Sequence, residues 1–166
     1  MDKDRDGDGA PATPAVRFLR QAAVRFIERP YRYIERGGTA AFAEQGGVDE
    51  HAVIKTLVME TEAGKPLVVL MHGDLEVSTK ELARALQTVS IRPCSEKDAE
   101  RHSGYTVGGI SPFGLRKALP VYVEATILEL KRIYINGGRR GLLVELSPLE
   151  LTRLLNAVPV RCGVKP

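Results

Sequence analysis

The sequence contains no tryptophan, only two cysteines and only three histidines among its 166 residues. Cys94 and Cys162 lie far apart and in no metal-binding spacing, which argues against a disulfide framework and is typical of reduced thiols in a cytoplasmic protein. His51, His72 and His102 have no His-x-x-x-His or Cys-x-x-Cys companion. We therefore expect these histidines to be exposed at loops or strand ends, and we predict no metal site.

Long hydrophobic runs are also missing. No apolar segment approaches the roughly 20 residues that a membrane-spanning helix needs, and the N-terminus lacks the apolar core of a signal peptide. We therefore expect a cytoplasmic protein with neither a membrane nor DNA as a partner.

Neither sign of charge dominates the sequence, which has 24 basic and 21 acidic residues. The net charge is +3, and there is no run of five or more basic residues. Residues 2–8 hold four aspartates against Lys3 and Arg5, a balance of −2, which leaves +5 for the rest of the chain. This mildly basic remainder is compatible with an RNA partner but does not require one.

Length and composition indicate one domain. Apolar residues make up 43% and charged residues 27% of a chain long enough to bury a sizeable core. Residues 1–12 are rich in Gly and Asp and have no apolar period, so we expect a disordered tail over 1–12 and a single domain over 13–166. The alternating aspartates of the tail lack the glutamate that closes a calcium-binding loop.

Hydrophobic periodicity and turn signals predict more strands than helices, without regular βαβ alternation or internal repeats. This pattern indicates an α+β fold with a mixed or mostly antiparallel sheet. Helices are predicted from Thr13-Pro14, with apolar positions continuing to Phe26, then over 39–45, 78–87 and 95–102, and from Ser147-Pro148. Strands are predicted over 31–34, 53–60, 66–72, 90–93, 120–124, 132–136, 141–146 and 158–161, with a hairpin at 62–65 and a turn at 136–138.

The most informative segment is SGYTVGGISPFG, residues 103–114. Gly108 and Gly109 permit backbone angles closed to other residues and close approach of a ligand, and their N–H groups can form a concave donor surface. Pro112 fixes one dihedral angle and restricts Ser111 to extended geometry. The segment indicates a rigid ligand-binding loop, with a tight structural turn as the alternative.

Two further segments, VIKTLV at 53–58 and IYINGGRRGL at 133–142, accompany this loop. In this order and spacing the three resemble the YbaK/EbsC family of aminoacyl-tRNA deacylases, which share a fold with the editing domain of bacterial prolyl-tRNA synthetase. The resemblance covers about residues 13–161, and GYTVGGISP is similar to the YbaK branch, whose members hydrolyse cysteine mischarged onto proline tRNA. It implies a mixed, partly closed β-sheet or barrel surrounded by helices.

Lys55 is the key candidate for catalysis. On a strand it shares a face with Val53 and Leu57, so its ammonium group either extends to the edge of the core or points into a polar pocket. The resemblance implies the pocket, because Lys55 matches the lysine that the family needs for activity. Binding of a phosphate, support of the substrate carbonyl and a role as base all stay open.

The resemblance also implies a set of substrate-binding residues. Tyr31 aligns with a pocket tyrosine, with a buried core tyrosine as the alternative, and Asn136 stands where relatives often have serine. Leu143 stands where YbaK proteins commonly carry a small polar residue, which leaves a strict preference for cysteine open. The implied set is Tyr31, Thr56, Gly108, Gly109, Ile110, Ser111, Asn136, Gly137 and Gly138.

A nucleophile on the protein is not expected. Ser111 precedes proline and has no histidine in a recognisable partner motif, and its segment lacks the strand-turn-helix setting of an esterase. Arg139 and Arg140 are candidates for tRNA phosphates or ordinary solvated charges.

We therefore expect a Cys-tRNA(Pro) deacylase acting in trans without a cofactor, in which the thiol of the bound cysteine attacks its own ester. The expected partners are tRNA(Pro), tRNA(Cys) and prolyl-tRNA synthetase. The alternatives are a deacylase for another amino acid such as alanine, and a non-catalytic module that binds tRNA or an aminoacyl-nucleotide.

Overall fold

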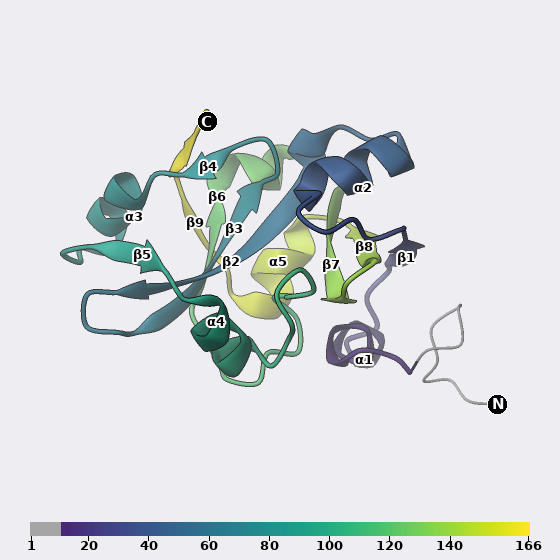
Figure 1. Cartoon of the computed structure of the whole chain (residues 1–166), viewed down its shortest axis with the longest axis horizontal. Coiled ribbons are helices and arrows are strands. Elements are labelled where there is room, and N and C mark those ends of the chain that lie inside the picture. The colour runs from purple at the N-terminus through teal and green to yellow at the C-terminus, as the bar shows by residue number, and fades with distance from the viewer. Residues whose placement is uncertain (1–10) are drawn as a thin grey trace.

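The computed structural model describes residues 11–166, which form an eight-stranded mixed sheet surrounded by helices (Figure 1). The strand order is β1-β8-β7-β2-β3-β6-β9, with β5 paired to β2 beside this path, and a separate two-stranded sheet joins β10 to β4. This arrangement confirms the expected α+β class with a mixed sheet. The strands are β1 Ile27–Pro30, β2 Val53–Thr61, β3 Pro66–His72, β4 Glu76–Val77, β5 Ile91–Pro93, β6 Val121–Glu124, β7 Ile133–Arg139, β8 Leu142–Leu146, β9 Val158–Val160 and β10 Gly163–Val164. The helices are α1 Pro14–Gln21, α2 Gly38–Gly46, α3 Thr79–Leu86, α4 Glu96–Ser103 and α5 Leu149–Leu155, with 3-10 turns η1 Glu50–Ala52 and η2 Ala125–Glu129.

β2 is the strand on which the site depends. One edge of β2 pairs antiparallel with β3 along residues 54–60. The other edge pairs with β7 only at residues 53–54 and with β5 only at residues 59–61. Figure 1 shows β5 and β7 at opposite ends of β2. Residues 55–58 therefore have no neighbouring strand on that edge, and the sheet is interrupted there.

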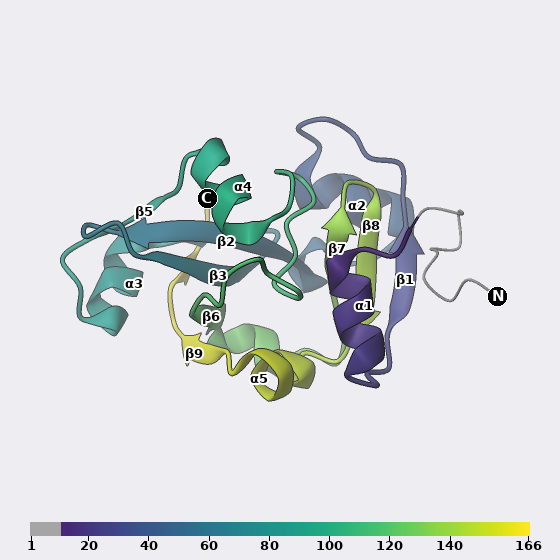
Figure 2. The same cartoon turned by 90° about the horizontal axis from the view of Figure 1, so that it is seen from below.

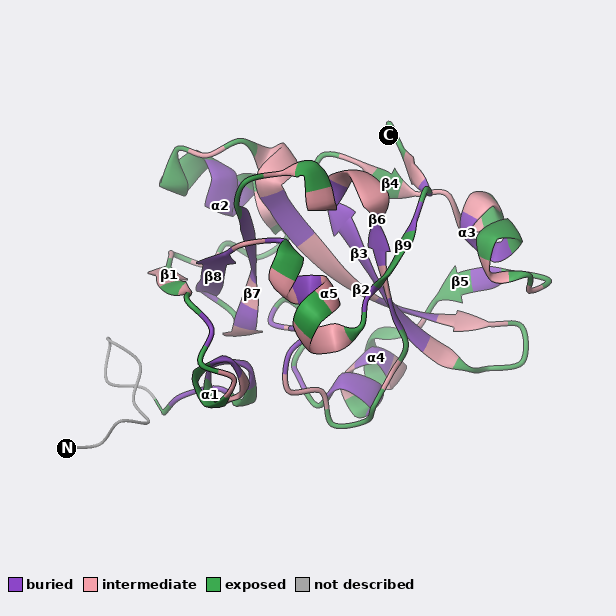
Figure 3. Cartoon of the chain, turned by 180° about the vertical axis from the view of Figure 1, so that it is seen from behind, coloured by how far each residue is buried: buried purple, intermediate pink, exposed green. Residues whose placement is uncertain are grey.

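The largest apolar cluster joins α1 and α5 to the middle of the sheet. Leu19 of α1 and Leu151 of α5 are fully buried in it, and Figure 3 shows the buried surface of the strands beside α5. Truncating such a leucine to alanine costs about 2–5 kcal/mol. The cluster holds the sheet that carries the site, and its strand members include Ile54, Leu70, Val123, Ile135 and Val144.

Three predicted helix starts are confirmed by side-chain caps. The hydroxyls of Thr13, Ser78 and Ser95 each accept a hydrogen bond from the backbone N–H three residues later, at 3.0, 3.2 and 3.1 Å. Thr13 has a second role, because its hydroxyl donates to the carbonyl oxygen of Gly137 at 2.5 Å. This bond joins the start of α1 to β7.

Two predictions near the N-terminus are wrong. The first helix ends at Gln21 and does not continue to Phe26, because Ala23 takes a left-handed φ of 55° and the N–H of Val24 returns to the carbonyl of Leu19. The strand predicted over 31–34 lies earlier, at β1. The aromatic residues that suggested a strand pack their rings on other elements, Tyr31 on Phe42.

The turn predicted at 136–138 is also wrong. β7 continues through these glycines to Arg139, with a shift of register between Asn136 and Arg139, and the chain turns at Arg140 and Gly141. Gly138 and Gly141 have positive φ values of 101° and 86°, so the glycines serve a bulge and the turn after it.

Most of the expected tail, with its alternating aspartates, lies outside the described residues. Of its last two residues, Ala12 is only 3% exposed and packs against Val16 and Leu142. The packed part of the chain therefore includes Ala12 as well as residues 13–166.

Replacing Thr13 by alanine tests the link between α1 and β7. The change removes the helix cap and leaves the Gly137 carbonyl without its donor, so we expect the free energy of unfolding to fall by about 1–3 kcal/mol. Urea denaturation measures this change. Thr13→Ser keeps the hydroxyl and should retain most of the stability, and equal losses in both variants would contradict the proposed bonds.

Candidate active site

A cavity of about 480 Å³ opens along the unpaired edge of β2. β2 contributes an unbroken run, residues 53–59, to its wall. Because alternate side chains of a strand point to opposite faces, a consecutive run can line one cavity only at the edge of the strand. The remaining walls come from the segment before α2, the start of α4, the glycine-rich loop, β7 and β8. Figure 2 shows α4 and α2 at different positions along β2, with α2 toward the end of the strand where β7 lies.

The main chain of Thr56 faces this cavity. The carbonyl of Val53 accepts from Gly73 and the N–H of Thr61 donates to Lys65, so odd-numbered residues of β2 direct their backbone groups toward β3. Even-numbered residues face the other edge, where the carbonyl of Val58 accepts from the N–H of Cys94. The N–H and carbonyl of Thr56 lie on that same edge, in the stretch without a neighbouring strand.

The Thr56 side chain adds a third polar group. Its hydroxyl oxygen is buried and has no hydrogen-bond partner within residues 11–166. A buried polar group without a partner costs about 1–3 kcal/mol, which a ligand or a water molecule can offset. The Thr56 hydroxyl can therefore form a hydrogen bond with a polar group of a ligand in the cavity.

Lys55 lies next to Thr56 and is half-buried. Its Nζ donates to the carbonyl of Leu75 at 2.5 Å. Burial lowers the pKa of Lys55, while the negative charges of Glu76, Glu50 and Asp74 oppose the shift. An ammonium group has three donors, so the bond to Leu75 leaves two for a substrate.

The glycine-rich loop contributes Gly108 and Ile110 to the cavity wall. Gly108 has a φ of 92°, and a Cβ there would lie 2.9 Å from the hydroxyl of Tyr33. Gly109 does not line the cavity: its N–H donates to the carbonyl of Thr106, and a Cβ there would lie 2.9 Å from the backbone of Arg139. The loop therefore uses Gly109 for close packing, and this N–H is not free for a substrate.

The bulge of β7 supports the loop from behind. Asn136 lines the cavity, and its side-chain amide donates to the carbonyl of Gly108 at 3.0 Å while its Oδ1 accepts from the N–H of Gly138 at 2.7 Å. Gly137 and Gly138 lie outside the cavity wall. Ser111 is fully buried, and its hydroxyl accepts from the N–H of Phe113. Thus six of the ten predicted site residues, Tyr31, Lys55, Thr56, Gly108, Ile110 and Asn136, line the cavity, and Gly109, Ser111, Gly137 and Gly138 support it from outside.

One end of the cavity is apolar. Tyr31 contacts the ring of Phe42 edge to face, with centroids 5.3 Å apart, and burial raises the pKa of Tyr31. Phe42, Val53 and Leu143 belong to one apolar cluster and line this end. Such a wall suits the small side chain of an amino acid.

Some lining residues were missed by the sequence analysis. Tyr33 and Arg36 lie in the segment between β1 and α2, and Cys94 and Glu96 lie where β5 leads into α4. The Gly37-Gly38 pair beside Arg36 is the one local signal that could have indicated this wall. Cys94 has no such signal, because it reaches the cavity through the pairing of β5 with β2.

Comparison with known proteins identifies the family. Residues 37–154 match the family model of the aminoacyl-tRNA editing domain. This chain belongs to the aminoacyl-tRNA editing domain family. Over 145 residues, 87% of the chain, it is 31% identical to the Enterococcus faecalis protein named "Putative Cys-tRNA(Pro)/Cys-tRNA(Cys) deacylase EbsC", of which it covers 88%. It is also 28% identical to proline–tRNA ligase of Brachyspira hyodysenteriae over 86 residues, which is 52% of this chain and 15% of the ligase.

Solved structures share the fold of this editing domain. The hypothetical protein APE2540 matches with a TM-score of 0.84 at 24% identity, over 91% of this chain and 99% of that one. A crystal structure of a "putative trans-editing enzyme for prolyl tRNA synthetase" matches with a TM-score of 0.79 at 20% identity, over 93% of this chain and 99% of that one. The family assigns the chain to the aminoacyl-tRNA deacylases. Within residues 11–166, no helix has the length and apolarity needed to cross a membrane.

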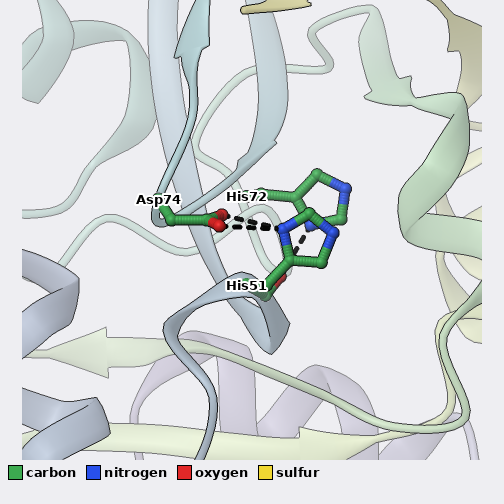
Figure 4. Close-up of side chains that lie close together, drawn as sticks. All are labelled: His51, His72 and Asp74. Carbon is green, nitrogen blue, oxygen red and sulfur yellow. Dashed lines mark hydrogen bonds and ion pairs between the residues drawn. The ribbon is translucent and has the colours of Figure 1, made fainter. Parts of the chain in front are cut away.

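The editing domain also carries a histidine pair where β2 begins and β3 ends. Figure 4 shows His51 and His72 with stacked rings, whose centroids are 3.6 Å apart and whose planes differ by 6°. His51 Nδ1 lies 2.8 Å from a carboxylate oxygen of Asp74, while His72 donates through Nδ1 to the carbonyl of His51 and contacts the hydroxyl of Thr126 through Nε2. The expectation of exposed histidines is wrong for His72 and His102, which are 0% and 7% exposed.

His51, His72 and Asp74 form the one group of potential metal ligands found within residues 11–166. Ring nitrogens bind a metal in the plane of the ring, and the parallel planes of His51 and His72 do not direct their lone pairs at a common point. Both nitrogens of His72 are also occupied by protein groups. The arrangement therefore fits a structural contact better than a metal site.

The stability of this editing domain should depend on the protonation of His72. Burial lowers its pKa below the usual 6.5. Below about pH 6.5, His72 binds a proton in the unfolded chain but stays neutral in the native state. The free energy of unfolding is therefore highest above this pH and falls as the pH drops toward the native pKa of His72. The slope of unfolding free energy against pH between 6.5 and 5.5 should be smaller in His72→Gln. An NMR titration placing the native His72 pKa at or above 6.5 would contradict this.

Proposed function

We propose that this editing domain cleaves the aminoacyl ester of cysteine mischarged on tRNA(Pro), acting in trans, and accepts Cys-tRNA(Cys) as a second substrate. One observation carries the proposal: the open edge of β2 presents Lys55 and the polar groups of Thr56 to a cavity with an apolar end. The name of the Enterococcus faecalis relative supports the choice of amino acid.

Lys55 serves as the group that stabilises developing negative charge. Its ammonium is held in place by the Leu75 carbonyl, and its two remaining donors can reach the ester carbonyl as that oxygen becomes an oxyanion. The Thr56 N–H on the open edge is a second donor for the same oxygen. Fixed donors of this kind need no reorganisation during the reaction, and losing one typically costs about 100-fold or more in rate.

The cavity offers no activated nucleophile. Within the described residues no histidine lines it, and the Ser111 hydroxyl is buried outside its wall. Cys94 does line the cavity, but burial and the nearby Glu60 raise the pKa of its thiol, which disfavours the reactive thiolate. This leaves the substrate itself or a water molecule as the nucleophile, and we assign the role to the substrate.

The substrate thiol provides that nucleophile. The sulfur of the bound cysteine loses its proton and attacks its own ester carbonyl, so a C–S bond forms and the C–O bond to the terminal ribose breaks. The ribose oxygen takes up a proton, and the tRNA leaves together with a four-membered thiolactone that water opens to free cysteine. The protein contributes position and charge stabilisation, which suffice when attack is intramolecular.

Alanine is the alternative amino acid that the cavity favours. Leu143 joins Phe42 and Val53 in an apolar wall, which would also hold the methyl group of alanine. Deacylation of Ala-tRNA(Pro) would then require activated water. Similarity to proline–tRNA ligases supports tRNA(Pro) and that synthetase as partners.

A panel of charged tRNAs tests the proposed function. Purified protein should release cysteine from Cys-tRNA(Pro) well above the spontaneous rate and leave Ser-tRNA(Pro) intact. Faster release from Ala-tRNA(Pro) would favour the alanine substrate, and binding without turnover of any ester would show a non-catalytic module.

Lys55→Ala should lower kcat/KM for Cys-tRNA(Pro) by about 100-fold, the scale of one lost transition-state contact. The fold should survive, because Lys55 is only half-buried and one bond is lost. Lys65→Ala in the exposed β2–β3 turn removes the same charge far from the cavity and should turn over at the wild-type rate. Equal activity of the two variants would remove Lys55 from the mechanism.

Substrate-thiol attack predicts that enzyme thiols are dispensable. The Cys94→Ala, Cys162→Ala double variant should keep its kcat, whereas Cys-tRNA(Pro) with an S-methylated side chain should be nearly inert. Binding of the methylated substrate is measured alongside to separate poor fit from lost chemistry. Rapid cleavage of a methylated substrate that binds normally would rule out attack by the substrate thiol and indicate that water is the nucleophile.

A further inference from the structure

We propose that Arg36 binds the phosphodiester next to the terminal adenosine of the substrate, and that Lys55 does not. This inference rests on the proposed function, since it assumes an aminoacyl ester at the 3′ end of an RNA. The terminal nucleotide joins the rest of the RNA through one phosphodiester, so this is the negative charge nearest to the ester. A cation at the cavity can therefore position the substrate without touching the reacting atoms.

Arg36 has the geometry of an available cation. It lies between β1 and α2, lines the cavity and is exposed. Within residues 11–166 it makes no hydrogen bond or ion pair. Its φ of 60° is unusual for a residue other than glycine, and such conformations are found preferentially at functional sites.

Lys55 is unsuited to a phosphate. The carboxylates of Glu76, Glu50 and Asp74 act on its ammonium group, which is also bonded to the Leu75 carbonyl. An anionic phosphate at this position would be repelled by three negative charges. A neutral ester carbonyl would not be repelled in the same way before the reaction, so the acidic surroundings direct Lys55 to the ester and leave the phosphate to another cation.

The neighbouring Arg140 does not line the cavity. Its Nε donates to the carbonyl of Val107 at 2.9 Å, and its guanidinium lies 5.2 Å from the centre of the Tyr33 ring. The first contact holds the glycine-rich loop, and the second packs Arg140 on the segment before α2. The other charged group on the cavity wall is the carboxylate of Glu96, which cannot bind a phosphate. Within residues 11–166, Arg36 is therefore the one cation on this wall that has no protein partner, because Lys55 is bonded to the Leu75 carbonyl.

Two minimal esters test the proposal. One is cysteinyl-adenosine, which has no phosphate, and the other is the cysteinyl ester of cytidylyl-adenosine, which has one phosphodiester. Wild-type protein should prefer the dinucleotide by about tenfold or more in kcat/KM, through KM, the scale of one charge-assisted hydrogen bond. Arg36→Gln should lose this preference, because its KM should rise about tenfold for the dinucleotide ester and far less for cysteinyl-adenosine.

Arg32→Gln is the matched control. Arg32 lies in the same segment, is exposed and does not line the cavity, so this variant loses the same charge and should keep the preference. Retention of the preference in Arg36→Gln, or an equal loss in both variants, would overturn the assignment. The dissociation constants of cytidylyl-adenosine and adenosine, which carry no ester, give the same comparison of ligands with and without a phosphodiester in the absence of catalysis. If neither ester is cleaved, the proposed function fails, while a binding preference that Arg36→Gln abolishes would still support Arg36.

Discussion

The site depends on one interruption in the hydrogen-bonding ladder of the sheet. β7 and β5 pair with opposite ends of the same edge of β2, and residues 55–58 between them have no strand partner. Buried backbone groups normally pair, because an unpaired one costs about as much as a lost hydrogen bond. The gap therefore leaves the backbone N–H and carbonyl of Thr56 for a ligand to satisfy, next to the apolar core.

The surrounding elements keep this gap open. The glycine-rich loop is held away from it, because Asn136 donates to the carbonyl of Gly108 and Arg140 donates to the carbonyl of Val107. Asn136 is in turn positioned by the bulge of β7, which Thr13 anchors from the start of α1. The glycines of both motifs thus act mainly through close packing, which allows the walls to approach without filling the cavity.

Charge is divided along the cavity. Lys55 lies among carboxylates that offset its ammonium charge, whereas Arg36 has no partner within the described part of the chain. A substrate with a neutral ester and a nearby phosphate can match both environments at once. In the mechanism that we propose, this division separates the group that acts on the transition state from the group that positions the RNA, and only the former affects the chemical step directly.

Local sequence signals determined much of the fold, and six of the ten residues predicted for the site line the cavity. The hydroxyl caps of Thr13, Ser78 and Ser95 and the alternation in β2 and β3 act within a few residues, so helix starts and the central hairpin were predictable. Lys55 was predicted for the site because a lysine in an apolar strand and the family motif pointed to the same residue, and it lines the cavity. The prediction of a turn at 136–138 was wrong because glycines permit a bulge as readily as a turn, and strand pairing decides between the two.

Only the tertiary structure decided which residues meet at the cavity. Arg36 and Cys94 reach it through the position of α2 and the pairing of β5 with β2, contacts between segments far apart in sequence. Burial of His72 likewise follows from the packing of η2 against the end of β3. A sequence pattern indicates the backbone geometry of its own segment. The exposure of a side chain, the charges around it and its unpaired hydrogen-bonding groups depend instead on the segments that pack against it.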